Sequence, residues 1–234
     1  MNTTTKPRLG TRGQPEESRA AILQAAVREF AREGVAGART DAIALSAGVN
    51  KALLYYYFKD KEALYQAVLD DVFSGVRAAI RQALAQELPP KAKLCAYVRA
   101  HFDYIASNPL YQRLVHAEFL RAGKDPSRLQ RVAEHFFRPI FAELRVLLTE
   151  GRESGDFRQV DPVHFIPSMI SVIVFYFTTA PIMKVVTGID PISSKRIAER
   201  RAAVVDFISA ALFIPSCQPA GHREAEHSSK GGRK

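Results

Sequence analysis

The sequence predicts an all-α protein, with a three-helix helix-turn-helix domain at the N-terminus, a larger helical domain after it, and about nine helices in total. Apolar residues recur every three or four positions along most of the chain, and Gly and Pro interrupt the pattern at helix-length intervals. Strand-like alternation is nearly absent. The run 170–177 is rich in β-branched and aromatic residues, but its length and helical flanks favour a buried helix.

Residues 1–14 are expected to form a flexible basic arm, because they carry Lys, Arg, Gly and Pro without an apolar stretch. They show neither a secretion signal nor a membrane anchor, which predicts a cytoplasmic protein. Lys6, Arg8 and Arg12 would either reach into a minor groove or stay in solvent. Residues 215–234, with Gly, Ser, His and Lys, are expected to form a disordered tail.

The first helix should begin at Pro15, since proline suits the first turn, where its missing amide is not needed. Ile22, Ala26 and Phe30 then recur at four-residue steps and give the helix one apolar stripe. Gly34 supplies a natural stop.

Three further helices should follow closely. One spans 40–47, and the next begins at Asn50, whose side chain can cap it, and ends near Phe58. The fourth should start at Asp60, another good cap, with Glu62 in the first turn, where a negative charge suits the helix dipole.

The rest of the chain keeps helical periodicity between Pro and Gly breaks. The expected helices span 61–87, 91–107, 109–122, 126–153, 162–187 and 193–214. The chain therefore divides into a helix-turn-helix domain over residues 15–60 and a second helical domain over residues 61–214.

Segment 40–64 carries the strongest functional signal. Ile43, Ala44 and Ala47 give a short helix a close-packing face, and Gly48 permits the left-handed backbone that turns the chain. Val49 would fill the corner between the two helices. Helices joined by such a tight turn cross steeply and expose the second along its polar side, as a reader of a DNA groove requires.

This segment resembles the signature of the tetracycline-repressor (TetR) family of regulators over about residues 15–65. Beyond residue 65, the resemblance rests on helix lengths and on short sequences such as Asn108-Pro109. The resemblance therefore does not indicate which ligand this chain binds. The matching phrases are Ile43-Ala44-x-x-Ala47-Gly48-Val49 and Leu54-Tyr55-x-Tyr57-Phe58-x-x-Lys61-Glu62-x-Leu64.

The resemblance implies that Tyr55, Lys61 and Thr40 hold DNA phosphates. Polar and cationic groups at helix N-termini, next to unpaired amides, do form anion sites. The exposed start and middle of the recognition helix would read base edges, with Lys51 meeting either guanine or a phosphate. The residues of that surface are Asn50, Lys51, Ala52, Leu53 and Tyr56.

Two residues depart from the family pattern. Asp41 stands where related proteins often place a basic or polar base contact, so its carboxylate would repel phosphate unless it accepts a hydrogen bond from cytosine. Arg39 replaces the usual capping threonine, which predicts either weaker capping or a direct contact of Arg39 with the DNA backbone. The large apolar residues of the motif are expected in the core: Leu54, Tyr57, Phe58 and Leu64.

Apolar stripes in the last two expected helices predict a homodimer interface. Two helices from each copy would form a four-helix bundle about a two-fold axis. That axis would set two recognition helices in successive major grooves, about 34 Å apart, and predicts a near-palindromic operator in double-stranded DNA. The interface residues are Ile170, Val174, Phe175, Phe177, Ile197, Val204, Val205, Ile208 and Leu212.

Aromatic and weakly polar side chains in the middle helices suit either a cavity for a small hydrophobic or aromatic effector or a plain core. Histidines and cysteines lack metal-ligand spacing, so no metal or other cofactor is expected. The candidate effector residues are His101, Phe102, Phe119, Phe137 and Phe141.

These patterns predict a sequence-specific DNA-binding regulator that represses until an effector releases it. An all-helical enzyme is the alternative from another class, but the sequence has no Gly-rich phosphate loop, nucleophile elbow or metal signature. A lipid-binding or membrane protein is a third, because the uncharged run 165–183 is nearly long enough to cross a bilayer. Pro167, Pro181 and the lack of a second hydrophobic segment favour a soluble protein without a membrane partner.

Overall fold

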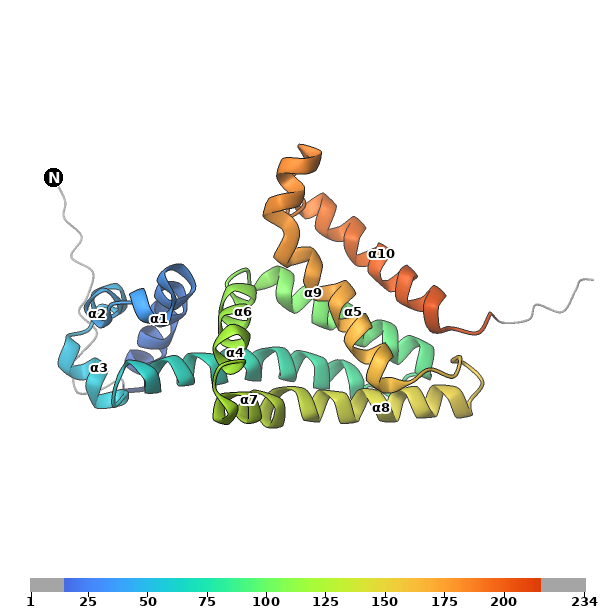
Figure 1. Ribbon diagram of the computed structural model, residues 1–234, viewed down its shortest axis with the longest axis horizontal. Coiled ribbons are helices and arrows are strands. Elements are labelled where there is room, and N and C mark those ends of the chain that lie inside the picture. Colours follow the sequence, from blue (N-terminus) through green and yellow to red (C-terminus); the bar gives the residue numbers. More distant parts are fainter. Residues whose placement is uncertain (1–14, 216–234) are drawn as a thin grey trace, which may run out of the picture.

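The computed structural model describes residues 15–215, which are helical almost throughout (Figure 1). The predicted arm at 1–14 and the predicted tail, apart from its first residue, lie outside these residues. The helices are α1 (Pro15–Gly37), α2 (Thr40–Ala47), α3 (Lys51–Tyr57), α4 (Lys61–Leu84), α5 (Pro90–Ser107), α6 (Tyr111–Ala122), α7 (Pro126–Val132), α8 (Arg138–Glu153), α9 (Pro162–Thr187) and α10 (Ser194–Leu212).

The helix boundaries agree with the sequence prediction to within a few residues. The predicted stop at Gly34 is a break inside α1, where the backbone adopts φ 68° and ψ 175° before a last short stretch to Gly37. A π-helical turn, Ala133–Phe137, joins α7 to α8. Residues 126–153 therefore form one continuous helical segment, as expected, but its periodicity did not predict the π-helical turn within it.

The π-helical turn follows from Pro139, which lies in the first turn of α8. Proline has no amide hydrogen, so the carbonyl of His135, four residues earlier, loses its usual helical partner. The Arg77 guanidinium of α4 donates to that carbonyl at 2.8 Å. A distant side chain thus satisfies the backbone group that the proline leaves free.

The three N-terminal helices form a small unit at one end of an elongated molecule (Figure 1). Ile22 of α1, Ile43 of α2 and Leu54 of α3 are fully buried in its core. The start of α4 belongs to the same core, because Tyr65 packs edge-on against Phe30 of α1 with 5.1 Å between ring centroids. Since α4 continues into the second domain, it joins the two parts.

The larger part of the molecule is built on α4 and α5, which pack along each other. α8 runs beside α4 along the long axis, while α9 and α10 lie against α5 (Figure 1). After α8, the chain returns through Phe157, whose ring stacks on Phe213 at the end of α10 with 5.5 Å between centroids. The largest buried side chains of this part include Tyr97, Phe102, Ile80, Leu94 and Ile105.

α9 is largely apolar but is not a buried helix. It is the one described helix that is long and apolar enough to cross a membrane, with a mean hydropathy of 1.8 over its best window, of which 17% is buried. Val185 and Val186 are 85% and 71% exposed, on the end of α9 that rises above the body (Figure 1). The prediction that this segment forms a buried helix is therefore wrong for the single chain. An exposed apolar surface of this size is typical of a binding surface for another molecule.

Candidate functional site

The turn between α2 and α3 has the geometry that the sequence predicts. Gly48 adopts the left-handed conformation, with φ 71°, and the Val49 amide donates to the carbonyl of Ala44 at 3.0 Å. The Asn50 side chain accepts a hydrogen bond from the Leu53 amide at 2.7 Å and so caps α3. A closed turn and a capped helix hold α3 in one orientation.

The outer face of α3 carries the residues predicted to read bases. Lys51, Ala52, Tyr55 and Tyr56 are exposed, Tyr56 to 80%. Leu53 is half-buried, at the edge of this face. On the inner face, the expected core residue Leu54 is buried and Tyr57 is half-buried, and the other two expected core residues, Phe58 after α3 and Leu64 in α4, are also buried. The periodicity therefore separated the two faces of α3 correctly.

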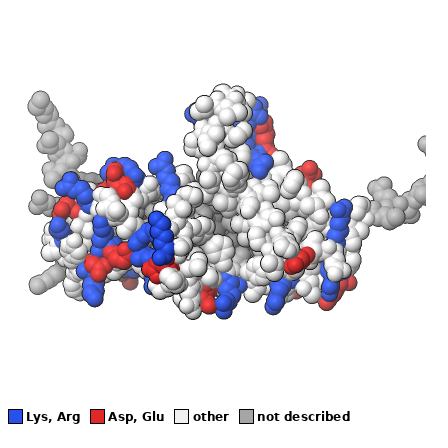
Figure 2. Space-filling model, in the orientation of Figure 1, with Lys and Arg blue, Asp and Glu red and all other residues white. Residues whose placement is uncertain are grey.

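The start of α2 lies beside the start of α3 on the same surface. The hydroxyl groups of Thr40 and Tyr55 lie 3.2 Å apart and are hydrogen-bonded. Lys51 forms an ion pair with Asp41, with 2.9 Å between Nζ and Oδ1. The Arg39 side chain caps nothing, which confirms weak side-chain capping of α2. Figure 2 shows Lys and Arg interspersed with Asp and Glu at this end of the molecule.

Lys61 has a structural role that the sequence did not reveal. Its ammonium donates to the carbonyls of Ala36 and Ala38, at 3.2 and 3.3 Å, beyond the break in α1. These carbonyls belong to a helix end, where backbone acceptors lack helical partners. An ammonium group carries three donors, so one remains for a further acceptor. Leu45 of α2, 82% exposed, is a further residue of this end that sequence reasoning missed.

The structure does not bring the five predicted effector residues together. Phe102 is buried in α5 against Phe177 of α9, with 5.0 Å between ring centroids, and His101 lies beside it in the core. Phe119 and Phe137 instead contact each other between α6 and the π-helical turn and are partly exposed. Phe141 packs at the edge of the main core. The predicted set is thus split between separate places.

A groove of about 460 Å³ between α4, α6 and the π-helical turn is a better candidate effector site. Its apolar wall includes Leu69, Phe73 and Phe136. The buried carboxylate of Glu118, 2% exposed, lines it from α6, and its Oε2 atom has no hydrogen-bond partner. The Arg121 Nη1 atom lies 3.7 Å from this oxygen, beyond hydrogen-bond distance, so Oε2 can still accept a hydrogen bond from a ligand N–H or O–H group.

Two arginines connect Glu118 to the start of α4, next to the N-terminal unit. Arg121 and Arg128 lie 3.7 and 3.5 Å from the Glu118 carboxylate and 2.9 and 2.6 Å from that of Glu62. Glu62 lies in the first turn of α4. Burial alone would raise the pKa of Glu62, but the hydrogen bonds from Arg128 and Arg121 outweigh it and lower that pKa. Glu62 is therefore charged at neutral pH, and the two arginines link the groove to the start of α4.

Arg121 also reaches the core of the N-terminal unit. Its guanidinium lies over the Tyr65 ring, 4.7 Å from the centroid, and Tyr65 in turn packs on Phe30 of α1. Arg121 therefore connects α6 to α4 and, through Tyr65, to α1, the two helices that flank the helix-turn-helix.

His101 is a buried neutral histidine. Its Nδ1 atom lies 3.2 Å from the Tyr97 hydroxyl, in a hydrogen bond within α5, and burial lowers the pKa of His101 to about 4. Below a pH of about 6.5 the unfolded chain therefore binds a proton that the folded chain refuses. This makes His101 a core residue with a measurable pH signature.

We expect the free energy of unfolding to fall as the pH drops from 6.5 towards 4, by about 3 kcal/mol in total from His101. Urea unfolding at several pH values measures this loss, and the His101→Gln variant should lack it. The matched control substitution is His164→Gln, at an exposed histidine of α9. Equal pH dependence in wild type and His101→Gln would contradict the assignment.

The structure corrects part of the predicted dimer interface. Val204, Ile208 and Leu212 are buried within the chain itself, since this face of α10 packs on α5, and they are unavailable to a partner. Outside this buried stripe, α10 exposes Phe207, which sequence reasoning missed. The remaining predicted residues are exposed, as Phe175 is, or half-buried, as are Ile170, Val174, Phe177, Ile197 and Val205.

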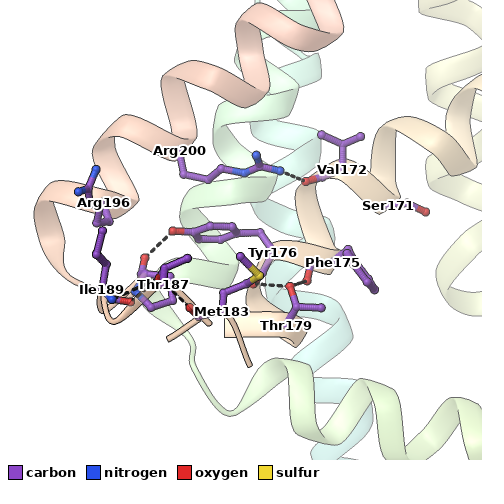
Figure 3. Close-up of a pocket in the computed structure, with 11 residues that line it drawn as sticks. Ser171, Val172, Phe175, Tyr176, Thr179, Met183, Thr187, Ile189, Arg196 and Arg200 are labelled. Atoms are coloured by element: carbon purple, nitrogen blue, oxygen red, sulfur yellow. Dashed lines mark hydrogen bonds between the residues drawn. The ribbon is translucent and has the colours of Figure 1, made fainter. Parts of the chain in front are cut away.

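A second groove, of about 620 Å³, lies between α9, α10 and the turn that joins them (Figure 3). The guanidinium of Arg200 donates to the carbonyl of Val172 at 3.1 Å and lies over the Tyr176 ring. Phe175 and Met183 line the rest of it and are exposed. The groove is continuous with the exposed apolar surface of α9, so a single binding partner could bury both.

Two family descriptions match the chain: "Bacterial regulatory proteins, tetR family" over residues 22–68 and "Tetracyclin repressor-like, C-terminal domain" over residues 90–208. The chain is 32% identical over 168 residues to the HTH-type transcriptional regulator RutR of Escherichia coli (strain K12), covering 72% of this chain and 77% of RutR. It is 34% identical over 143 residues to the HTH-type transcriptional repressor SCO4008 of Streptomyces coelicolor, covering 60% and 68%.

The fold is also found among solved structures. The TetR family transcriptional regulator PfmR from Thermus thermophilus superposes with a TM-score of 0.64 and 24% sequence identity, over 81% of this chain and 97% of PfmR.

Proposed function

Because the chain belongs to the TetR family of bacterial transcriptional regulators, we propose that it is a cytoplasmic homodimeric repressor that leaves a near-palindromic operator when a small molecule binds its C-terminal domain. Residues 15–60 are the DNA-binding domain, and residues 61–214 bind the effector and the second copy. The observation that carries this proposal is the capped helix α3, held outward by the Gly48 turn with its polar face exposed.

The proposed DNA contacts fall into two groups. Thr40, Tyr55 and Lys61, with Arg39 beside them, hold phosphates and fix the position of the domain on the duplex. The exposed side of α3 enters the major groove and reads base edges. The residues of that reading surface are Asn50, Lys51, Ala52, Leu53 and Tyr56.

The proposed effector site is the groove that Glu118 lines. A molecule that donates a hydrogen bond to Glu118 Oε2 competes with Arg121 and Arg128 for this carboxylate. Both arginines also form ion pairs with Glu62. Effector binding therefore alters the ion pairs at the start of α4. Release from DNA then follows as a population shift, if the effector binds the altered arrangement more tightly. This route makes the effector a hydrogen-bond donor with an apolar body.

The proposed dimer interface is the exposed apolar surface of α9 and α10. A symmetric pair of these helices buries side chains that one chain leaves in water, such as Phe175, Val186 and Phe207. This arrangement also accounts for the hydropathy of α9 without a membrane. A protein that needs detergent to stay in solution would favour the lipid-binding alternative.

Replacing Lys61 by Ala tests the phosphate contacts. We expect weaker binding to all sequences alike, and a salt dependence of log K reduced by roughly 0.9 for each phosphate that the variant no longer neutralises, because fewer counterions are released. Titrations of operator DNA at several salt concentrations measure the slope. Lys59→Ala is the matched control, since Lys59 is exposed and caps nothing. An unchanged slope in Lys61→Ala would remove Lys61 from the interface.

A further inference from the structure

An ion pair joins the proposed reading surface on α3 to the start of α2. Lys51 is the first residue of α3 and Asp41 lies in the first turn of α2, so their contact joins the two helix starts. The Lys51 Nζ atom lies 2.9 Å from one oxygen of Asp41 and 3.2 Å from the other. Both side chains are about half exposed, at 50% and 59%. The Lys51 ammonium, a donor, and the Asp41 carboxylate, an acceptor, therefore lie side by side and are accessible to a ligand from solvent.

The edge of a G·C pair in the major groove carries the complementary arrangement. Guanine O6 accepts, and cytosine N4 has one hydrogen free to donate after base pairing. O6 and N4 are hydrogen-bonded to each other, so they lie about 2.9 Å apart, which matches the separation of Lys51 Nζ and Asp41 Oδ1. The ion pair can meet this edge intact, with the ammonium on guanine O6 and the carboxylate on cytosine N4.

We propose that Asp41 and Lys51 act as one unit that reads a single G·C pair in each half of the operator. This inference rests on the proposed function, because it presumes that α3 enters the major groove. It assigns Asp41 a positive role in recognition, although a lone carboxylate in a DNA interface would only repel phosphates.

An A·T pair also has a donor beside an acceptor, but its neighbouring groups are unfavourable. With the carboxylate on adenine N6, Asp41 would face the acceptor N7. With the ammonium on thymine O4, Lys51 would lie against the C5-methyl group, where it loses hydration without gaining a partner. On G·C, the neighbour of O6 is the acceptor N7, which suits the ammonium. The unit therefore prefers G·C.

The contact with Asp41 also restrains Lys51. A free lysine at this position can turn to a phosphate, which carries no sequence information. The hydrogen bond and the charge of Asp41 raise the pKa of Lys51, so the ammonium keeps its proton. Held by Asp41, it stays directed at the bases. Loss of Asp41 should therefore reduce selectivity more than affinity.

Selection of bound fragments from random duplex DNA, with the full-length chain at one fixed salt concentration, tests the inference. We expect wild type to select a G·C pair at one position of each half-site, and both Asp41→Asn and Lys51→Ala to lower that preference about tenfold at the same position. All other positions should keep their preferences. The control is Asp103→Asn, which breaks an exposed ion pair of the second domain, Asp103 with Arg201 at 2.8 Å.

Two outcomes would overturn the inference while leaving the proposed function intact. In one, Asp41→Asn raises affinity for all sequences equally and changes no base preference, so the carboxylate merely repels phosphate. In the other, the two variants alter different positions, so the residues act separately. If wild type itself selects no sequence, the proposed function fails, and this result is distinguishable because it does not depend on either variant.

Discussion

Phe207→Glu should be a monomer that binds operator DNA little better than unrelated DNA. Phe207 lies on the face of α10 that points away from the core and is 60% exposed, so the substitution costs the single chain little. In a two-fold dimer, each change occurs twice, and two carboxylates would replace two buried rings. Loss of two large apolar anchors costs roughly 4 kcal/mol or more, which weakens the dimer about a thousandfold.

The consequence for DNA binding is large because the operator is read in two halves. A monomer contacts one half-site, and its affinity should fall towards the non-specific level, roughly 1,000-fold weaker. Sedimentation gives the oligomeric state, and titration of operator and unrelated DNA gives the selectivity. Leu120→Glu is the control, since Leu120 is equally exposed, at 61%, but lies on α6. A Phe207→Glu dimer with full operator affinity would place the interface elsewhere.

The helix-turn-helix could be predicted from the sequence because its determinants are local. Gly48, Asn50 and Asp60 each fix the backbone within a few residues of themselves, and the alternation of buried and exposed positions in α3 covers two turns. Here the sequence separation between the residues that interact is short. The helix boundaries could be predicted because they too depend on local residues. The π-helical turn could not, because Arg77 of α4, distant in the sequence, donates to the carbonyl of His135.

The surfaces of the second domain could not be predicted in the same way. Apolar residues of α10 lie outside its buried stripe as well as in it, and periodicity does not distinguish the side that packs on α5, with Val204 and Ile208, from the side with Phe207. The aromatic residues proposed for an effector share a composition, but Phe102 and Phe119 are separated by packing that involves other helices. The cluster around Glu118 depends on Glu62, far away in the sequence.

Arg128→Met should destabilise the protein by about 3 kcal/mol or more, because it removes the nearer of two guanidinium groups from the buried Glu118 carboxylate. The Arg128 side chain lies against three carboxylates, those of Glu62, Glu118 and Asp125. Of these, Glu118 is 2% exposed and would retain only Arg121, at 3.7 Å. Glu62 is half exposed, so water compensates for much of its loss. The cost therefore arises mainly at Glu118.

A second substitution separates this cause from simple loss of packing. In the Glu118→Gln variant the buried group is neutral, so adding Arg128→Met should cost much less than Arg128→Met alone, with a coupling of about 2 kcal/mol between the two positions. Urea unfolding of wild type, both single variants and the double variant gives this coupling. Arg138→Met is the matched control, because Arg138 pairs with Glu134 at 3.0 Å in solvent and should cost under about 1 kcal/mol. Additive losses at Glu118 and Arg128 would mean that the two residues do not depend on each other, and the proposed link from the groove to α4 would lose its central contact.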